Sequence, residues 1–243
     1  MTDRLAARGR EGASTLLGGR VVHEPGQGHR SGIEPVLLAA GIAARPGETV
    51  IEGGAGSGAA LLCLGARVPG LHLLGVERDP TTAALARRNA AANGADMAVL
   101  AEPLERVELP PADHAMANPP WHGAGTASPN ALREAARRAD PLLFAHWARA
   151  LAAPLRHRGT LTFVVAAGAC AACLAALGTV CGSLVLLPLW PRAGEAAKLV
   201  LLRGVRGGRG PSRVLPGLVL HEADGRFTPA VEAILRDGAP LSF

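Results

Sequence analysis

The run Asn118-Pro119-Pro120-Trp121 combines residue types that could bind a planar amine. The Asn118 side-chain oxygen can accept a hydrogen bond from an N–H group, and the Pro119 carbonyl, held outward by a stiff Pro-Pro pair, can accept another. Trp121 offers a flat face on which an extruded base could stack, a contact worth roughly 1–3 kcal/mol. The run is therefore compatible with a pocket for a planar amine, although an ordinary Pro-rich turn could use the same residues.

A second run, Glu52-Gly53-Gly54-Ala55-Gly56-Ser57-Gly58, is typical of a loop that leads from a strand into a helix. Glycines there let the backbone approach a ligand where the helix begins. Glu77, 19 residues past Gly58, ends the next predicted strand, and a carboxylate at that place can accept hydrogen bonds from both hydroxyls of a ribose. The pair predicts a nucleotide cofactor without deciding which one.

Strands and helices alternate along the chain, and this alternation must position both runs. We expect strands at 49–53, 71–77, 97–101, 113–117, 160–165 and 183–189, and helices at 57–67, 79–93, 166–177, from 140 and from 228 to 237. The pattern predicts an α/β fold, a Rossmann-like doubly wound and mainly parallel sheet in a single domain over residues 1–243. Ligands of such sheets bind at the carboxyl ends of the strands, where both runs stand.

These motifs together resemble the class I S-adenosylmethionine-dependent methyltransferases with an Asn-Pro-Pro-aromatic motif. Further segments are similar to the bacterial tRNA(Val) adenine-N6-methyltransferase family: 19–22, 28–34, 37–40, 191–194, 197–198, 219–222 and 227–229. The similarity extends from about residue 17 to residue 242. It implies methyl transfer from S-adenosyl-L-methionine to a nucleobase amine, adenine N6 in tRNA. The four cysteines of the chain fit no secreted disulfide framework, so we expect a cytoplasmic protein.

The resemblance also implies which residues do this. Glu52, Gly54, Gly56 and Gly58 would face the methionine part of the cofactor, Glu77 would bind its ribose, Glu102 would lie near its adenine, and Asn118, Pro119, Pro120 and Trp121 would form the acceptor pocket. Residues 1–34 would be an N-terminal extension on the cofactor and substrate side. Trp121 stands where Tyr or Phe is more usual, which keeps and enlarges the stacking face.

Several alternatives remain open. Gly54-x-Gly56-x-x-Ala59 also satisfies the nicotinamide-dinucleotide fingerprint, but an oxidoreductase would leave Asn118 to Trp121 without a role, and the chain has no tyrosine for a Tyr-Lys pair. A non-catalytic RNA-binding relative is disfavoured by the intact Asn118 and Glu77. Methyltransferases with the same motif type also act on protein glutamine, DNA adenine and rRNA guanine.

The charge gives only mild support for a nucleic-acid partner. Lys plus Arg exceeds Asp plus Glu by 25 to 20, for a net charge of +5, and Lys198 is the only lysine. The candidate phosphate contacts are Arg133, Arg137, Arg138, Arg192, Lys198 and the basic Gly-rich loop 203–213. A solvated arginine-rich surface would look the same.

The segment 161–190 carries no charged residue, yet its breaks at Gly178 and Gly182 favour strand, helix and strand over a membrane span. Because the helix 166–177 lacks a polar face, we expect a second copy of the chain to cover it. Cys170-x-x-Cys173 on that helix indicates packing, and we expect no metal site. His114 is expected to be structural, whereas His122 could touch substrate.

Overall fold

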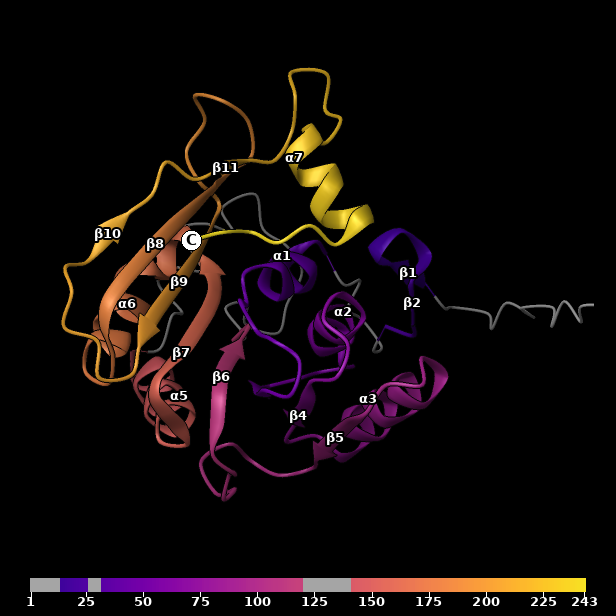
Figure 1. Ribbon diagram of the computed structural model, residues 1–243. Helices are drawn as coiled ribbons and strands as arrows, with labels where there is room; N and C mark the ends of the chain where they lie inside the picture. The colour runs from indigo at the N-terminus through magenta and orange to yellow at the C-terminus, as the bar shows by residue number, and fades with distance from the viewer. Residues whose placement is uncertain (1–13, 26–31, 120–140) are drawn as a thin grey trace, which may run out of the picture.

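The computed structural model describes residues 14–25, 32–119 and 141–243 of the chain. In that part, nine strands form one sheet in the order β10-β8-β9-β7-β6-β3-β4-β5, with β11 also paired to β8. The strands are β3 (Thr49–Gly53), β4 (His72–Val76), β5 (Met97–Leu100), β6 (Ala112–Ala117), β7 (Leu155–Ala166), β8 (Gly182–Trp190), β9 (Leu199–Val205), β10 (Arg213–Val214) and β11 (Leu218–Val219). Figure 1 shows the sheet running from β5 to β10.

The sheet is mainly parallel, as the alternation of strands and helices predicts. β3 pairs in parallel with β4 and β6, β4 with β5, and β6 with β7. β9 is the exception: it lies between β7 and β8 and runs antiparallel to both. The Rossmann-like α/β fold is therefore confirmed, with one strand reversed.

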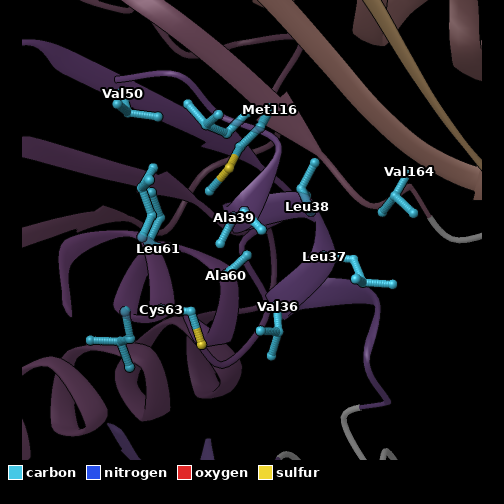
Figure 2. Close-up of a cluster of buried hydrophobic side chains, with 14 of the residues drawn as sticks. Val36, Leu37, Leu38, Ala39, Val50, Ala60, Leu61, Cys63, Met116 and Val164 are labelled. Atoms are coloured by element: carbon cyan, nitrogen blue, oxygen red, sulfur yellow. The ribbon is translucent and has the colours of Figure 1, made fainter. Parts of the chain in front are cut away.

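Helices cover both faces of the sheet because neighbouring strand residues point to opposite sides. The helices are α1 (Glu34–Ala40), α2 (Ala59–Arg67), α3 (Pro80–Ala92), α5 (Pro141–Ala152), α6 (Cys170–Gly178) and α7 (Pro229–Glu232). Val50 and Met116 join α1, α2 and α3 in one core, while Ile51 and Ala115 join α5 and α6 in the other. Figure 2 shows part of the first core, with Leu38 and Ala39 of α1 close to Met116.

The N-terminal hairpin of the described chain packs against the helical turn that precedes its last residues. β1 (Ser14–Leu16), the 3₁₀ turn η1 (Leu17–Gly19) and β2 (Val21–His23) form a small hairpin, and α7 continues into a π-helical turn, Ala233–Asp237. A Cβ placed on Gly18 would come within 2.6 Å of the Arg236 carbonyl oxygen, so the hairpin and the C-terminal turn are in close contact. Figure 1 shows the hairpin beside α7.

Several predicted boundaries differ from the structure: the strand expected at 160–165 is β7, Leu155–Ala166, and three other differences concern helices and a loop. The helix expected at 57–67 begins at Ala59, because Gly58 caps it with φ +87°. The helix expected at 166–177 is a 3₁₀ turn, Ala167–Ala169, followed by α6. Arg203, expected in the loop 203–213, belongs to β9, where its guanidinium lies 4.4 Å from the centre of the Phe243 ring.

The uncharged segment 161–190 folds as strand, helix and strand, as predicted. No helix in the described ranges is long and apolar enough to cross a membrane. The outward side of α6 consists of small residues, with Ala171 and Ala175 exposed. The large hydrophobic side chains exposed elsewhere are Val22, Leu142 and Val214, so α6 presents none of them.

Candidate active site

Neighbouring strands of the sheet end in one row, which fixes the place of the site. Gly53 of β3 pairs with Val76 of β4 on one side and with Ala117 of β6 on the other. Val76 in turn pairs with Leu100 of β5. The residues that follow these strand ends therefore emerge at a single edge of the sheet, as the doubly wound fold predicts.

The glycine loop leaves β3 at this edge in a conformation that only glycine adopts readily. Gly54, Gly56 and Gly58 have φ values of +65°, +56° and +87°. The loop is closed by two hydrogen bonds, from the Ala55 N–H to the Val76 carbonyl (3.0 Å) and from the Gly58 N–H to the Ala55 carbonyl (2.9 Å). These bonds hold the start of α2 against the end of β4.

The glycines of the loop differ in what surrounds them. A Cβ on Gly54 would come within 2.6 Å of the Trp147 ring, so Trp147 of α5 packs closely against the loop. A Cβ on Gly56 would meet nothing within 4 Å. The space beside Gly56 is open to a ligand, whereas the side of Gly54 is filled by protein.

Glu77 ties the loop to the start of α3. Its Oε2 accepts a hydrogen bond from the Gly56 N–H at 3.0 Å, and its Oε1 accepts one from the Asp79 N–H at 2.9 Å. Asp79 in turn caps α3 by accepting from the Thr82 N–H at 2.7 Å, and this bond holds its carboxyl pKa below the ordinary value. Because each carboxylate oxygen has a second lone pair, Glu77 can still accept from two ribose hydroxyls.

Glu52 lies beneath the loop and is only 3% exposed. Its Oε2 has no hydrogen-bond partner among the described residues. Burial raises the pKa of this carboxyl well above its ordinary value, and the Leu61 backbone amide offsets the shift only in part. An unpartnered buried carboxyl next to an open glycine loop fits a ligand that carries positive charge.

The remaining predicted residues divide between described and undescribed parts of the chain. Glu102 is exposed two residues past the end of β5, at the same edge as Glu77. Asn118 and Pro119 directly follow β6, Asn118 partly buried and Pro119 buried. Pro120 and Trp121 lie outside the described residues, as do four further candidates: His122, Arg133, Arg137 and Arg138.

The N-terminal hairpin contributes residues to the loop that the sequence did not single out. His23 is fully buried, and its Nε2 lies 2.7 Å from the Ser57 hydroxyl in the glycine loop. The Asn89 side-chain amide of α3 donates to the Ser57 carbonyl at 2.9 Å and to the Glu24 carbonyl at 3.0 Å. Two asparagines one turn apart in an alanine-rich helix, Asn89 and Asn93, were the available signal for this contact.

Asn93 binds the backbone of the same hairpin strand, β2, farther from the glycine loop. Its Oδ1 accepts from the Val22 N–H at 2.9 Å, and its Nδ2 donates to the Val22 carbonyl at 2.7 Å. Asn89 bonds the Glu24 backbone in the same manner. The two asparagine side chains thus form hydrogen bonds with the Val22 and Glu24 backbone as a second neighbouring strand would. Of the two, only Asn89 also contacts the glycine loop.

The basic candidates separate to opposite edges of the sheet. Arg192 and Lys198 are exposed in the loop between β8 and β9, at the edge where Ala166 pairs with Leu199 and where the site lies. The loop 206–212 follows the other end of β9, where Val205 pairs with Thr160. The basic Gly-rich loop is therefore remote from the glycine loop and Asn118.

Two other candidates have structural roles. His114 lies within β6, with Nδ1 2.7 Å from the Thr160 hydroxyl and Nε2 3.1 Å from Glu48. Cys173 is buried in the core under α6, as predicted, and no group of three or more possible metal ligands occurs in the described residues.

Residues 34–147 match the family model described as Methyltransferase small domain. Together with the sheet and its edge, this match supports a class I methyltransferase fold with S-adenosyl-L-methionine as the cofactor. The open space at Gly56 and the buried, unpartnered Glu52 carboxyl fit that cofactor, whose methionine amino group and sulfonium are cationic.

Solved structures share this fold. A predicted O-methyltransferase from Agrobacterium tumefaciens, protein Atu636, is 26% identical with a TM-score of 0.73, over 86% of this chain and 99% of that one. RsmC from T. thermophilus, a 16S rRNA N2 G1207 methyltransferase solved with AdoMet and guanosine, is 22% identical with a TM-score of 0.57. That match covers 80% of this chain and 49% of RsmC, so the chain spans about half of the RsmC length. A comparison with curated proteins gives no match.

Proposed function

We propose that the chain is an S-adenosylmethionine-dependent N-methyltransferase acting on an exocyclic amine of a nucleobase, adenine N6 in tRNA. The observation that carries the proposal is the common end of β4, β3 and β6. Through it Glu77, the glycine loop and Asn118 follow three adjacent strands at one edge. Methyl transfer requires the donor and the acceptor nitrogen within roughly 3–3.5 Å, which adjacent strand ends can provide.

The cofactor side of the proposal assigns a role to each residue at this edge. Glu77 would hold the ribose hydroxyls, Glu102 would lie near the adenine, and Glu52 with the glycines at 54, 56 and 58 would face the methionine part. S-adenosylmethionine supplies an electrophilic methyl group on a sulfonium. The buried Glu52 carboxyl complements this positive charge.

The acceptor side rests on Asn118 and Pro119, which follow β6 directly. The Asn118 side-chain oxygen and the Pro119 carbonyl would accept hydrogen bonds from the amine and orient its lone pair toward the methyl group. Pro120 would stiffen the turn, and Trp121 would stack on the base. In-line transfer needs alignment rather than a base of tuned pKa.

The substrate class follows from the acceptor chemistry and from charge at the same edge. Arg192 and Lys198 are exposed beside the site and suit backbone phosphates. RsmC, a 16S rRNA N2 G1207 methyltransferase, acts on an exocyclic nitrogen of a guanine in RNA, which is the same type of acceptor. We propose tRNA as the substrate and the cytoplasm as the location. Identifying the methylated product distinguishes tRNA adenine from the alternative acceptors, which are rRNA guanine, DNA adenine, protein glutamine and an oxygen atom.

Two substitutions test the division between acceptor and cofactor residues. Asn118→Ala should lower methyl transfer roughly 10²–10³-fold and leave cofactor affinity unchanged, because it removes an acceptor aimed at the amine. Glu77→Gln should weaken cofactor binding about tenfold, because the one remaining oxygen can hold the Gly56 N–H, while the NH₂ group can accept neither from the Asp79 N–H nor from a ribose hydroxyl. Calorimetric titration of the cofactor and a methyl-transfer assay on tRNA measure the two effects. Equal loss of cofactor binding in both variants would contradict the proposed roles.

A further inference from the structure

A hollow with basic walls lies at the edge of the sheet opposite the site. It encloses about 620 Å³ and is lined by His157, Arg158, Gly207, Arg209 and Gly210. These residues come from the start of β7 and from the loop after β9. On β7 the site edge is reached at Ala166, six residues beyond Thr160, which is roughly 20 Å of strand.

The positive charge of this hollow is largely unpaired. Arg158 and Arg209 are exposed on its wall, and Arg206 and Arg213 lie in the adjoining segment. In the described residues no carboxylate forms an ion pair with any of these four arginines, whereas Arg156 is paired with Asp113 at 3.0 Å. A cationic surface without internal counter-ions is suited to an anionic partner.

Arg158 occupies a backbone conformation that favours glycine. Its φ is +71°, in the left-handed region, and Gly159 is the next residue. Two hydrogen bonds impose this geometry: the Arg158 N–H donates to the Arg206 carbonyl at 3.0 Å, and the Arg206 N–H donates to the Gly159 carbonyl at 2.8 Å. An arginine at a strained position that would suit glycine indicates a use for its side chain.

We propose that this basic hollow binds backbone phosphates of the RNA substrate, away from the nucleotide that is methylated. Arg158, Arg209 and Arg213 are exposed and Arg206 is half-buried. They are spread along a strand end and a loop, which matches successive phosphates better than a single enclosed anion. Guanidinium groups bind phosphate oxygens through paired hydrogen bonds. The inference rests on the proposed function, because it takes RNA as the substrate.

The separation of the hollow from the site makes the binding dependent on RNA length. Roughly 20 Å corresponds to about six nucleotides at 3.4 Å per nucleotide along one strand of a helix. A trinucleotide in the acceptor pocket cannot reach the hollow, whereas a full tRNA can. The hollow should therefore lower the KM for tRNA and leave that for a trinucleotide unchanged.

The test uses the full chain with the double substitution Arg158→Gln and Arg209→Gln. Its affinity for a fluorescein-labelled tRNA transcript should fall about tenfold at 0.1 M salt, and the slope of log affinity against log salt should decrease in magnitude by roughly 1.4–1.8. The matched control is Arg226→Gln with Arg236→Gln, which removes equal charge from exposed arginines that have their own partners, Asp224 and Glu232. The control should keep the wild-type affinity and slope.

A single substitution separates binding from folding. Arg158→Gly relieves the left-handed backbone and removes the cation, so it should raise the temperature of unfolding while weakening tRNA binding. Loss of tRNA affinity together with loss of stability would indicate a structural role only and would overturn the proposal. Wild-type tRNA affinity in the double variant, or an equal loss in the control, would also overturn it.

The two proposals fail in distinguishable ways. If tRNA is methylated but the double variant retains the wild-type KM and salt slope, the hollow is not a phosphate site and the proposed function stands. If no RNA is methylated but the double variant alone loses tRNA binding, the hollow stands and the proposed reaction fails. Saturable binding of inorganic phosphate without any change in tRNA affinity would assign the hollow to a free anion and overturn the RNA proposal.

Discussion

Glu52 is a buried carboxyl, and in the protein without cofactor its burial disfavours the ionised form. Its Oε2 has no hydrogen-bond partner among the described residues, and burial raises its carboxyl pKa well above the ordinary 4.5. Between 4.5 and the raised value, the folded protein keeps a proton that the unfolded chain releases. The contribution of Glu52 to stability is therefore present below pH 4.5 and is lost as the pH rises through this window.

We predict that Glu52→Gln stabilises the protein at pH 7–8, because it removes the cost of keeping a buried carboxyl whose pKa is raised. The same change should weaken cofactor binding, since the negative charge opposite the methionine part is lost. Thermal unfolding between pH 4 and 8 and calorimetric titration of the cofactor measure both effects. Glu105→Gln, at an exposed position, is the control and should change neither. A less stable Glu52→Gln protein at pH 8, or unchanged cofactor affinity, would speak against this role.

At the scale of elements, the glycine loop is held from two sides. Glu77 at the end of β4 binds the Gly56 N–H, while β2 and α3 hold Ser57 through His23 and Asn89. The sequence singled out Glu77 as an acidic residue at a strand end that could bind a ribose, but its hydrogen bond to the Gly56 N–H is seen only in the structure. The sequence could not predict the second contact, because β2 is a three-residue strand whose partner side chains lie more than 60 residues away.

We predict that His23→Ala weakens cofactor binding several-fold, because Ser57 loses the contact that fixes the loop. Asn93→Ala is the matched control: it loosens the same strand without touching Ser57, so it should lower stability by about 1 kcal/mol and leave cofactor affinity unchanged. Equal cofactor affinities for the two variants would show that the hairpin does not position the loop.

The same contact should depend on pH. Burial lowers the pKa of the His23 imidazole below its ordinary 6.5. Between 6.5 and the lowered value, the unfolded chain therefore binds a proton that the folded chain does not bind. The stability that His23 contributes is present above pH 6.5 and is lost as the pH falls toward the lowered value. Thermal unfolding of His23→Asn between pH 5 and 8 should show a shallower decline than the wild type. An identical decline would exclude His23 as a source of this pH dependence.

At the scale of the whole molecule, alternating strands and helices were enough to predict a parallel sheet and the edge at which Glu52, Glu77 and Asn118 gather. The reversed strand β9 was not predicted, because a buried strand reads alike in either direction. That reversal carries the loop 206–212, named from the sequence as a candidate phosphate contact, to the edge opposite the site, roughly 20 Å away along β7.

The covering of helix 166–177 by a second copy of the chain stays a prediction. In the structure, the outward side of α6 carries small side chains such as Ala171 and Ala175, and larger side chains such as Leu177 are buried against the sheet. Light scattering at high concentration checks the oligomeric state, and a strictly monomeric protein would refute the predicted interface.

The most direct test of the central claim is identification of the methylated product. The protein is incubated with S-adenosylmethionine labelled in the methyl group and, separately, with tRNA, rRNA, DNA or protein, and each acceptor is digested and its modified component identified. We predict label in tRNA as N6-methyladenosine, lost in Asn118→Ala. Label in protein, on a ring nitrogen of a base or on an oxygen atom would contradict the assignment of an exocyclic amine as the acceptor.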